Sequence, residues 1–211
     1  KVDGYTLFVK DAVIGDVAEV KVMKAKKHYG YARLMKILLP SKDRVEPVCP
    51  VARQCGGCQI QALNYEKQLE FKHNKVRNNL IRLGGIPEEL LDEIMEPAAG
   101  MKEPFRYRNK AQFPIGRDRD GKLTAGFYAG IPVPERDCVL GVKENKEILD
   151  AILEFMQVEH IEPYNEENHS GLVRHVLIRY GFRTGEIMVC LVINGKTLPH
   201  SEKLVESLTK I

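Results

Sequence analysis

The chain has 211 residues, of which 44% are hydrophobic and 29% are charged, and its formal net charge at pH 7 is +3. This length allows one or two small domains with real hydrophobic cores, and the longest apolar runs, such as residues 188–193, are far shorter than the roughly 20 residues that a membrane-spanning helix needs. We therefore expect a cytoplasmic protein without membrane contact, and the mild overall charge does not by itself indicate a nucleic-acid partner.

Residues 1–43 have the pattern of β-strands. Segment 5–9 is rich in strand-forming residues, Gly15 and Asp16 mark a turn, and apolar and polar residues alternate over 18–23. We expect a small, barrel-like β unit. Basic and aromatic residues that could contact phosphates and stack on bases follow each other in its second half, although lysines on a strand edge also prevent aggregation. These candidate RNA-binding residues are Lys24, Lys26, Lys27, Tyr29 and Arg33.

Residues 44–62 form a loop with three cysteines, Cys49, Cys55 and Cys58, and a fourth, Cys138, follows eighty positions later. Two glycines inside the loop let the backbone turn tightly. A three-plus-one arrangement of thiols favours a 4Fe-4S cluster. Zinc also accepts four cysteines, but usually from two Cys-x-x-Cys pairs. Disulfides or core thiols are a third explanation, which a reducing cytosol disfavours.

A helix is predicted from Asn64, whose side chain can cap exposed amides, to Leu83. Apolar residues recur along it at helical spacing, the opposite side is basic, and two glycines end it. A short helix follows from Pro87.

Residues 105–128 read as a β-hairpin that turns at 117–121. Period-2 alternation predicts that three cations and one amide share a face of its first strand, and they could contact an RNA backbone or simply face solvent. These residues are Arg106, Arg108, Lys110 and Gln112.

The last third of the chain predicts a helix over 144–157, a second hairpin with strands 172–180 and 186–193, and a further helix from Pro199. Dense β-branched content predicts that both strands are central in an antiparallel sheet. Cys190 has apolar neighbours in the sequence, so we expect it to be a buried core thiol. The predicted class is α+β, with residues 63–211 forming an antiparallel-sheet α/β central domain.

Four stretches, 47–50, 55–59, 65–72 and 105–111, resemble the 23S rRNA (uracil-5-)-methyltransferases of the RumA type. The resemblance covers most of the chain. It implies that residues 1–43 are an incomplete TRAM domain, an OB-like β-barrel, and that 44–62 are an iron-sulfur loop. It also implies that the basic stretches above bind RNA. Segment 130–134 is shorter than the family pattern. The ligands implied for the 4Fe-4S cluster are Cys49, Cys55, Cys58 and Cys138.

Methylation of carbon 5 of uracil needs a nucleophilic thiolate, a base and a glycine-rich loop that holds S-adenosylmethionine. We recognise no catalytic residue and no residue for that cofactor in this sequence. The resemblance implies a later Rossmann-like domain that supplies them, so we expect the chain to be the RNA-handling part of a monomeric enzyme that acts on 23S rRNA, and to be inactive alone. The alternatives are a zinc- or iron-sulfur-stabilised RNA-binding module without catalysis, and an iron-sulfur electron-transfer protein.

Overall fold

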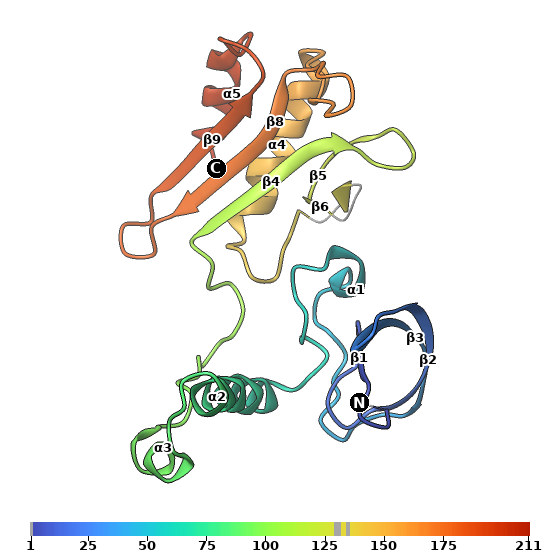
Figure 1. Ribbon diagram of the computed structural model, residues 1–211. Coiled ribbons are helices and arrows are strands. Elements are labelled where there is room, and N and C mark those ends of the chain that lie inside the picture. The colour runs from blue at the N-terminus through green and yellow to red at the C-terminus, as the bar shows by residue number, and fades with distance from the viewer. Residues whose placement is uncertain (1, 129–131, 134–135) are drawn as a thin grey trace. The chain divides into compact units, whose positions relative to one another are not determined.

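The computed structural model describes residues 2–128, 132–133 and 136–211, and it has a mixed α+β fold. The chain forms two compact units (Figure 1). Unit 1 contains Lys1–Val48 and Cys58–Lys102, and unit 2 contains Cys49–Gly57 and Glu103–Ile211. Within the described residues, no helix is long and apolar enough to cross a membrane.

The first part of unit 1 is a three-stranded sheet with the order β1-β3-β2. Its strands are β1 (Thr6–Val9), β2 (Val17–Ala25) and β3 (Tyr29–Leu39), which confirms the strands predicted there. β1 pairs with β3 in parallel, and β2 and β3 form an antiparallel hairpin with three register shifts. Such bulges increase bend and twist, and β2 and β3 are strongly curved in Figure 1.

A buried ion pair ties the start of β2 to the segment after β3. The Asp16 carboxylate, whose side chain is only 1% exposed, pairs with the Arg44 guanidinium at 2.6 Å. It also accepts hydrogen bonds from the main-chain amides of Val13 and Ser41, at 2.8 and 3.0 Å. The predicted turn at Gly15 and Asp16 is therefore a junction that holds both ends of the hairpin.

The second part of unit 1 contains two helices, α2 (Tyr65–Arg82) and α3 (Glu88–Ile94). Asn64 caps α2 as predicted, because its side-chain oxygen accepts a hydrogen bond from the Lys67 amide at 2.9 Å. The apolar stripe of α2 is not a core stripe, since no residue of this helix is buried within the described structure. Leu83, just after the helix, is 84% exposed.

Unit 2 is built on a four-stranded antiparallel sheet with the order β5-β4-β8-β9. Its strands are β4 (Lys110–Arg117), β5 (Leu123–Ala125), β8 (Val173–Tyr180) and β9 (Ile187–Ile193). β6 (Phe127–Tyr128) and β7 (Pro132–Val133) form a separate pair. The short helix α1 (Ala52–Cys55) also belongs to this unit.

One face of this sheet forms the core with two helices, α4 (Glu144–Val158) and α5 (Ser201–Leu208), and α4 runs behind β4 and β8 in Figure 1. Phe113 of β4 and Val176 of β8 are completely buried against Leu149 and Ile152 of α4. Burial of each such side chain contributes about 1.5–3 kcal/mol. Both helices and the second hairpin lie where the sequence predicted them.

Three expectations for unit 2 are wrong. The first strand of the hairpin begins at Lys110, not at Arg106, because the preceding segment pairs with residues 139–141 instead of a sheet neighbour. β9 is an edge strand, not a central one. Cys190 is exposed, because it lies on the sheet face opposite the helices. The expected shortening at 130–134 falls largely outside the described residues.

Candidate functional site

The cysteine loop is a compact turn closed by its own backbone. The carbonyl oxygen of Cys49 accepts a hydrogen bond from the Ala52 amide at 3.2 Å, and the Cys55 amide donates to the carbonyl oxygen of Val51 at 2.8 Å. Gly56 then ends α1 in the left-handed region, at φ +70°. A Cβ atom on Gly57 would lie 3.3 Å from the Cys55 sulfur. The two glycines therefore let the chain turn and leave space beside this sulfur.

The Cys138 turn is held by Arg106. The Arg106 amide donates to the carbonyl oxygen of Val139 at 2.9 Å, and its guanidinium donates to those of Cys138 and Gly141 at 3.1 and 3.2 Å. The same guanidinium pairs with the Asp137 carboxylate at 2.5 Å. This hydrogen bond lowers the pKa of Asp137. Arg106, with φ +54°, thus lies in the wall of the Cys138 turn and not on a strand face.

The four cysteines have the donor chemistry for a cluster and are divided between the two units, with Cys58 in unit 1 and the others in unit 2. All five cysteines of the chain carry thiols; Cys49 is buried, and Cys55, Cys58 and Cys138 are half-buried. Segment 49–57 belongs to the same compact unit as Cys138, which brings two of the predicted ligands into the unit of the distant one. Across residues 2–128, 132–133 and 136–211, no group of three or more Cys, His, Asp or Glu side chains is placed to hold a metal ion, so the ligand set stays a prediction. Four soft thiolates suit an iron-sulfur centre.

Some of the predicted basic residues of unit 1 lie beside a group of three rings, two of which are exposed. Phe8, Tyr29 and Tyr31 have ring centroids 5.7–5.8 Å apart, and we call them the aromatic cluster. Phe8 is 55% and Tyr31 45% exposed. The Lys26 ammonium lies 5.2 Å from the centre of the Tyr29 ring. Lys24, Lys27 and Arg33 are exposed on the same β2–β3 hairpin.

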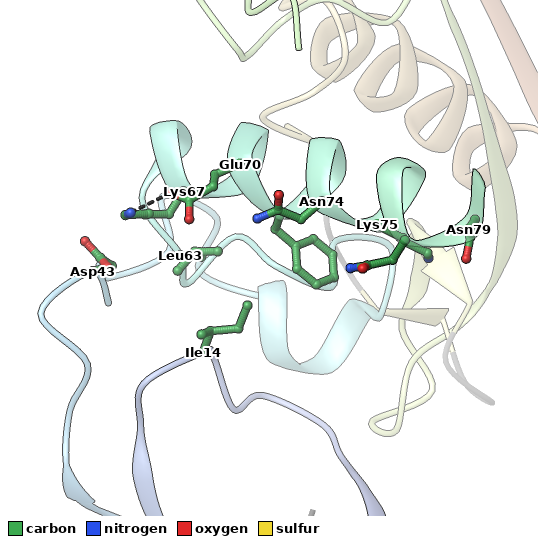
Figure 2. A pocket seen from close by; sticks show the side chains of 10 residues that line it. Ile14, Asp43, Leu63, Lys67, Glu70, Asn74, Lys75 and Asn79 are labelled. Carbon is green, nitrogen blue, oxygen red and sulfur yellow. Dashed lines mark hydrogen bonds and ion pairs between the residues drawn. The ribbon is translucent and has the colours of Figure 1, made fainter. Parts of the chain in front are cut away.

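A hollow of about 470 Å³ runs along α2 in unit 1. Figure 2 shows Lys67, Asn74 and Lys75 of α2 on one side of it, and Ile14 and Leu63 on the other. The Lys67 ammonium pairs with the Glu70 carboxylate at 2.5 Å, which raises the pKa of Lys67. Amide and ammonium groups on an apolar floor are suited to polar ligands, but nothing in the hollow forms a catalytic arrangement.

In unit 2, two of the predicted RNA-binding residues share the sheet face opposite the helices, which we call the open face. Lys110 and Gln112 are exposed there, and Lys110 lies directly opposite Arg179 of β8. Like charges in direct cross-strand register are unfavourable unless an anion or solvent compensates them. Arg108 is exposed but lies before β4, bridged to Gly141. The predicted row of four residues is therefore reduced to two on the strand.

Sequence reasoning missed Phe8 and Arg179 as candidate RNA contacts and did not select Tyr31. Phe8 reaches the aromatic cluster because β1 pairs in parallel with β3 and places it opposite Tyr31. Hydrophobic alternation in β1 alone contains no sign of that pairing. Arg179 could have been found from the predicted antiparallel sheet, since it alternates with apolar β8 residues.

Comparison with known proteins gives a consistent result, although no protein-family model matches the chain. Proteins named uncharacterized RNA methyltransferase from Clostridium tetani and Halalkalibacterium halodurans are 40% and 43% identical to it over 213 residues. These alignments cover 100% of this chain and 45% of each relative. The crystal structure of Pyrococcus abyssi tRNA (uracil-54, C5)-methyltransferase in complex with S-adenosyl-L-homocysteine matches with a TM-score of 0.68 and 28% identity, covering 94% of this chain and 44% of that one.

The fold and these similarities place the chain among relatives of RNA methyltransferases. The chain is similar over its full length to proteins named RNA methyltransferase, which agrees with its resemblance to the RumA type. It spans less than half the length of the curated relatives that it matches.

Proposed function

We propose that the chain is the RNA-binding and iron-sulfur portion of an S-adenosylmethionine-dependent methyltransferase that makes 5-methyluridine in 23S rRNA. The observation that carries this proposal is the aromatic cluster with its lysines, in a chain related over its full length to RNA methyltransferases. Exposed rings beside cations provide stacking and phosphate contacts together.

The open face of unit 2 supports the same proposal. Lys110 and Arg179 are paired across two strands without an intervening carboxylate in their register, so an RNA phosphate would relieve their repulsion. Gln112, on the same face, adds a hydrogen-bonding group. RNA contacts from both units would together supply the few kcal/mol that flipping a base out of its stack costs.

The iron-sulfur part of the proposal assigns Cys49, Cys55, Cys58 and Cys138 as ligands of a 4Fe-4S cluster. When bound, the cluster would cross-link the cysteine loop to the Cys138 turn. Arg106, which pairs with Asp137, would then hold the backbone of one ligand through the hydrogen bond that it already donates to Cys138. Such a role is structural, because methyl transfer requires no one-electron carrier.

S-adenosylmethionine and the residues for methyl transfer belong, in this proposal, to the remaining length of the enzyme. Its support is the solved relative, which carries S-adenosyl-L-homocysteine and is more than twice as long as its matched part. The 211 residues alone are then inactive. We further propose a monomer in the cytoplasm.

A second candidate substrate is tRNA, because the solved relative is named as a tRNA (uracil-54, C5)-methyltransferase. The test is to incubate the full-length enzyme with S-adenosylmethionine labelled in the methyl group and with unmodified 23S rRNA or tRNA in separate reactions. Label in 5-methyluridine of 23S rRNA alone is the expected result. Label in tRNA alone would show that tRNA is the substrate instead of 23S rRNA. Label in neither RNA would reject both candidate substrates.

A further inference from the structure

A second hollow, of about 1150 Å³, lies in unit 2 beside the open face. Its lining comes from β4, from the start of β8 and from the loop over residues 162–171. Gln112 and His175 belong both to this lining and to the open face. The hollow therefore continues the surface that we propose binds RNA.

The loop that forms one wall is fixed by its own contacts. The Asn194 side-chain amide donates to the carbonyl oxygens of His169 and Gly171, each at 3.2 Å. Gly171 has φ +83°, and a Cβ atom there would come within 2.1 Å of the Pro163 oxygen. Any other residue would force the loop apart, so Gly171 lets this wall pack closely.

Planar groups line this wall. The Arg174 guanidinium lies over the Tyr164 ring, 5.1 Å from its centre, and the Tyr164 hydroxyl is 2.7 Å from Nδ1 of His169. Glu166 accepts two hydrogen bonds from Arg174, at 2.7 and 3.0 Å. Arginine and tyrosine planes held in this way are surfaces on which a base can stack.

The charges of the hollow argue against a phosphate as its ligand. Two arginines, Arg117 and Arg174, line it, and each is paired with a glutamate, Glu162 or Glu166. A third glutamate, Glu167, also lines it. Burial, followed by the nearby Arg174, lowers the pKa of His175, so this imidazole is a neutral hydrogen-bonding group at pH 7. Carboxylates beside flat groups instead favour a planar ligand with N–H donors.

We infer that this hollow binds one unpaired nucleobase of the RNA, with guanine preferred. The carboxylate of Glu167, the lining glutamate that is in neither of these two ion pairs, can accept hydrogen bonds from both N1–H and the 2-amino group of guanine, whereas uracil offers a single N–H on the corresponding edge. Single-stranded RNA is read in this way, by stacking and by hydrogen bonds to exposed base edges. The inference rests on the proposed RNA binding and adds a base preference to it.

The test uses the 211-residue chain and fluorescence anisotropy with four labelled nine-nucleotide RNAs. Three are uridine tracts with a central guanosine, inosine or adenosine, and the fourth is all uridine. The guanosine RNA should bind about tenfold more tightly than the all-uridine RNA, within the range of a bidentate base contact. Inosine keeps N1–H but lacks the 2-amino group, so the affinity of the inosine RNA should lie between those of the guanosine and all-uridine RNAs.

The Glu167→Gln variant, which leaves the Arg174–Glu166 pair intact, should lose the guanosine preference while still binding the all-uridine RNA. Glu154→Gln, an exposed change on α4, is the matched control and should keep the preference. Circular dichroism melts check that each variant is folded. Equal affinity of the unaltered chain for the guanosine and all-uridine RNAs, or a preference that survives in the Glu167→Gln variant, overturns the base pocket but leaves the proposed RNA binding intact. Failure to bind any of the four RNAs rejects both.

Discussion

The Arg106 guanidinium donates a hydrogen bond to the main-chain carbonyl oxygen of Cys138, with a donor-to-acceptor distance of 3.1 Å. The two residues are 32 positions apart in the sequence. A cation that the sequence suggested as an RNA contact is thus used to shape the turn of a predicted cluster ligand.

Arg106→Ala should lower the free energy of unfolding by about 1–2 kcal/mol, because it removes hydrogen bonds from a charged donor that is only partly exposed. The free energy of unfolding of Arg106→Lys should lie between those of Arg106→Ala and the unaltered chain, since an ammonium cannot reproduce the planar fork of a guanidinium. Urea denaturation measures both. Arg108→Ala, at an exposed position, is the control, and an equal loss in this control would contradict the role given to Arg106.

The cysteine assignment predicts a brown protein with about four iron atoms per chain after anaerobic purification. Replacing Cys138 by Ala should abolish the visible absorbance and lower solubility, because a lost ligand unlinks two segments. Cys190→Ala should leave the iron content unchanged. Stoichiometric zinc without iron or sulfide would show that the ligand set binds a different metal.

The Asp16–Arg44 pair predicts a pH dependence of stability. The hydrogen bond from Arg44 holds the pKa of the buried Asp16 carboxyl well below its usual range, so below about pH 5 the unfolded chain binds more protons than the folded one. The stabilisation is therefore complete above the usual carboxyl pKa and is lost as the pH falls through the lowered one. Asp16→Asn should cost about 3 kcal/mol at pH 7 and flatten the acid limb of the stability curve.

Urea denaturation between pH 2 and pH 7 measures this effect. Glu19→Gln, an exposed change on β2, serves as the control. An acid limb of unchanged slope in Asp16→Asn would mean that other carboxyls determine the acid sensitivity.

Cys190 should react quickly with a thiol reagent in the folded protein, because it is exposed on the open face. Cys190→Ala should remove this fast phase and change the free energy of unfolding by less than about 0.5 kcal/mol. Ile178→Ala, on the buried face of the neighbouring strand, should cost about 2–5 kcal/mol. Slow labelling that appears only on unfolding would place the thiol in a core after all.

If the aromatic cluster stacks on RNA bases, removing one of its rings should lower RNA affinity by the same factor at every salt concentration. Phe8→Ala and Tyr31→Ala should each weaken single-stranded RNA binding by about 1–3 kcal/mol without changing the salt slope. Lys27→Ala should instead reduce that slope by about one unit, because it removes a phosphate contact. Filter binding between 50 and 300 mM salt separates the two effects. Phe182→Ala changes a ring that is 56% exposed in unit 2, and an equal loss there would mean that the cluster has no special role.

Helices α2 to α5 and the second hairpin were predictable because their signals are local. Asn64 stands directly before an amphipathic stretch, and the second hairpin is two apolar runs around a short turn. The prediction that residues 106–109 belong to the strand was wrong because their backbone forms hydrogen bonds with residues 139–141. Period-2 alternation cannot show such a pairing. The predicted burial of Cys190 was wrong because β9 is apolar on both faces, so its sequence does not indicate which face the helices cover.

The same limit applies to the candidate sites. The cysteine spacing is a property of the sequence and needed no fold to be noticed. The aromatic cluster depends on a parallel pairing between segments that are 23 positions apart in register, such as Phe8 and Tyr31. The base pocket depends on a loop that meets β4 only in the folded sheet. Sites assembled by long-range pairing are therefore the ones that sequence patterns leave out.

The division of unit 2 into Cys49–Gly57 and Glu103–Ile211 determines how the protein can be dissected. A recombinant fragment that starts at Glu103 retains the sheet and its helices but lacks the stretch with Cys49 and Cys55. A fragment that stops at Lys102 carries this stretch without the rest of the unit to which it belongs. An isolated and complete unit 2 therefore requires a permuted gene, in which residues 49–57 are joined through a designed linker to residues 103–211.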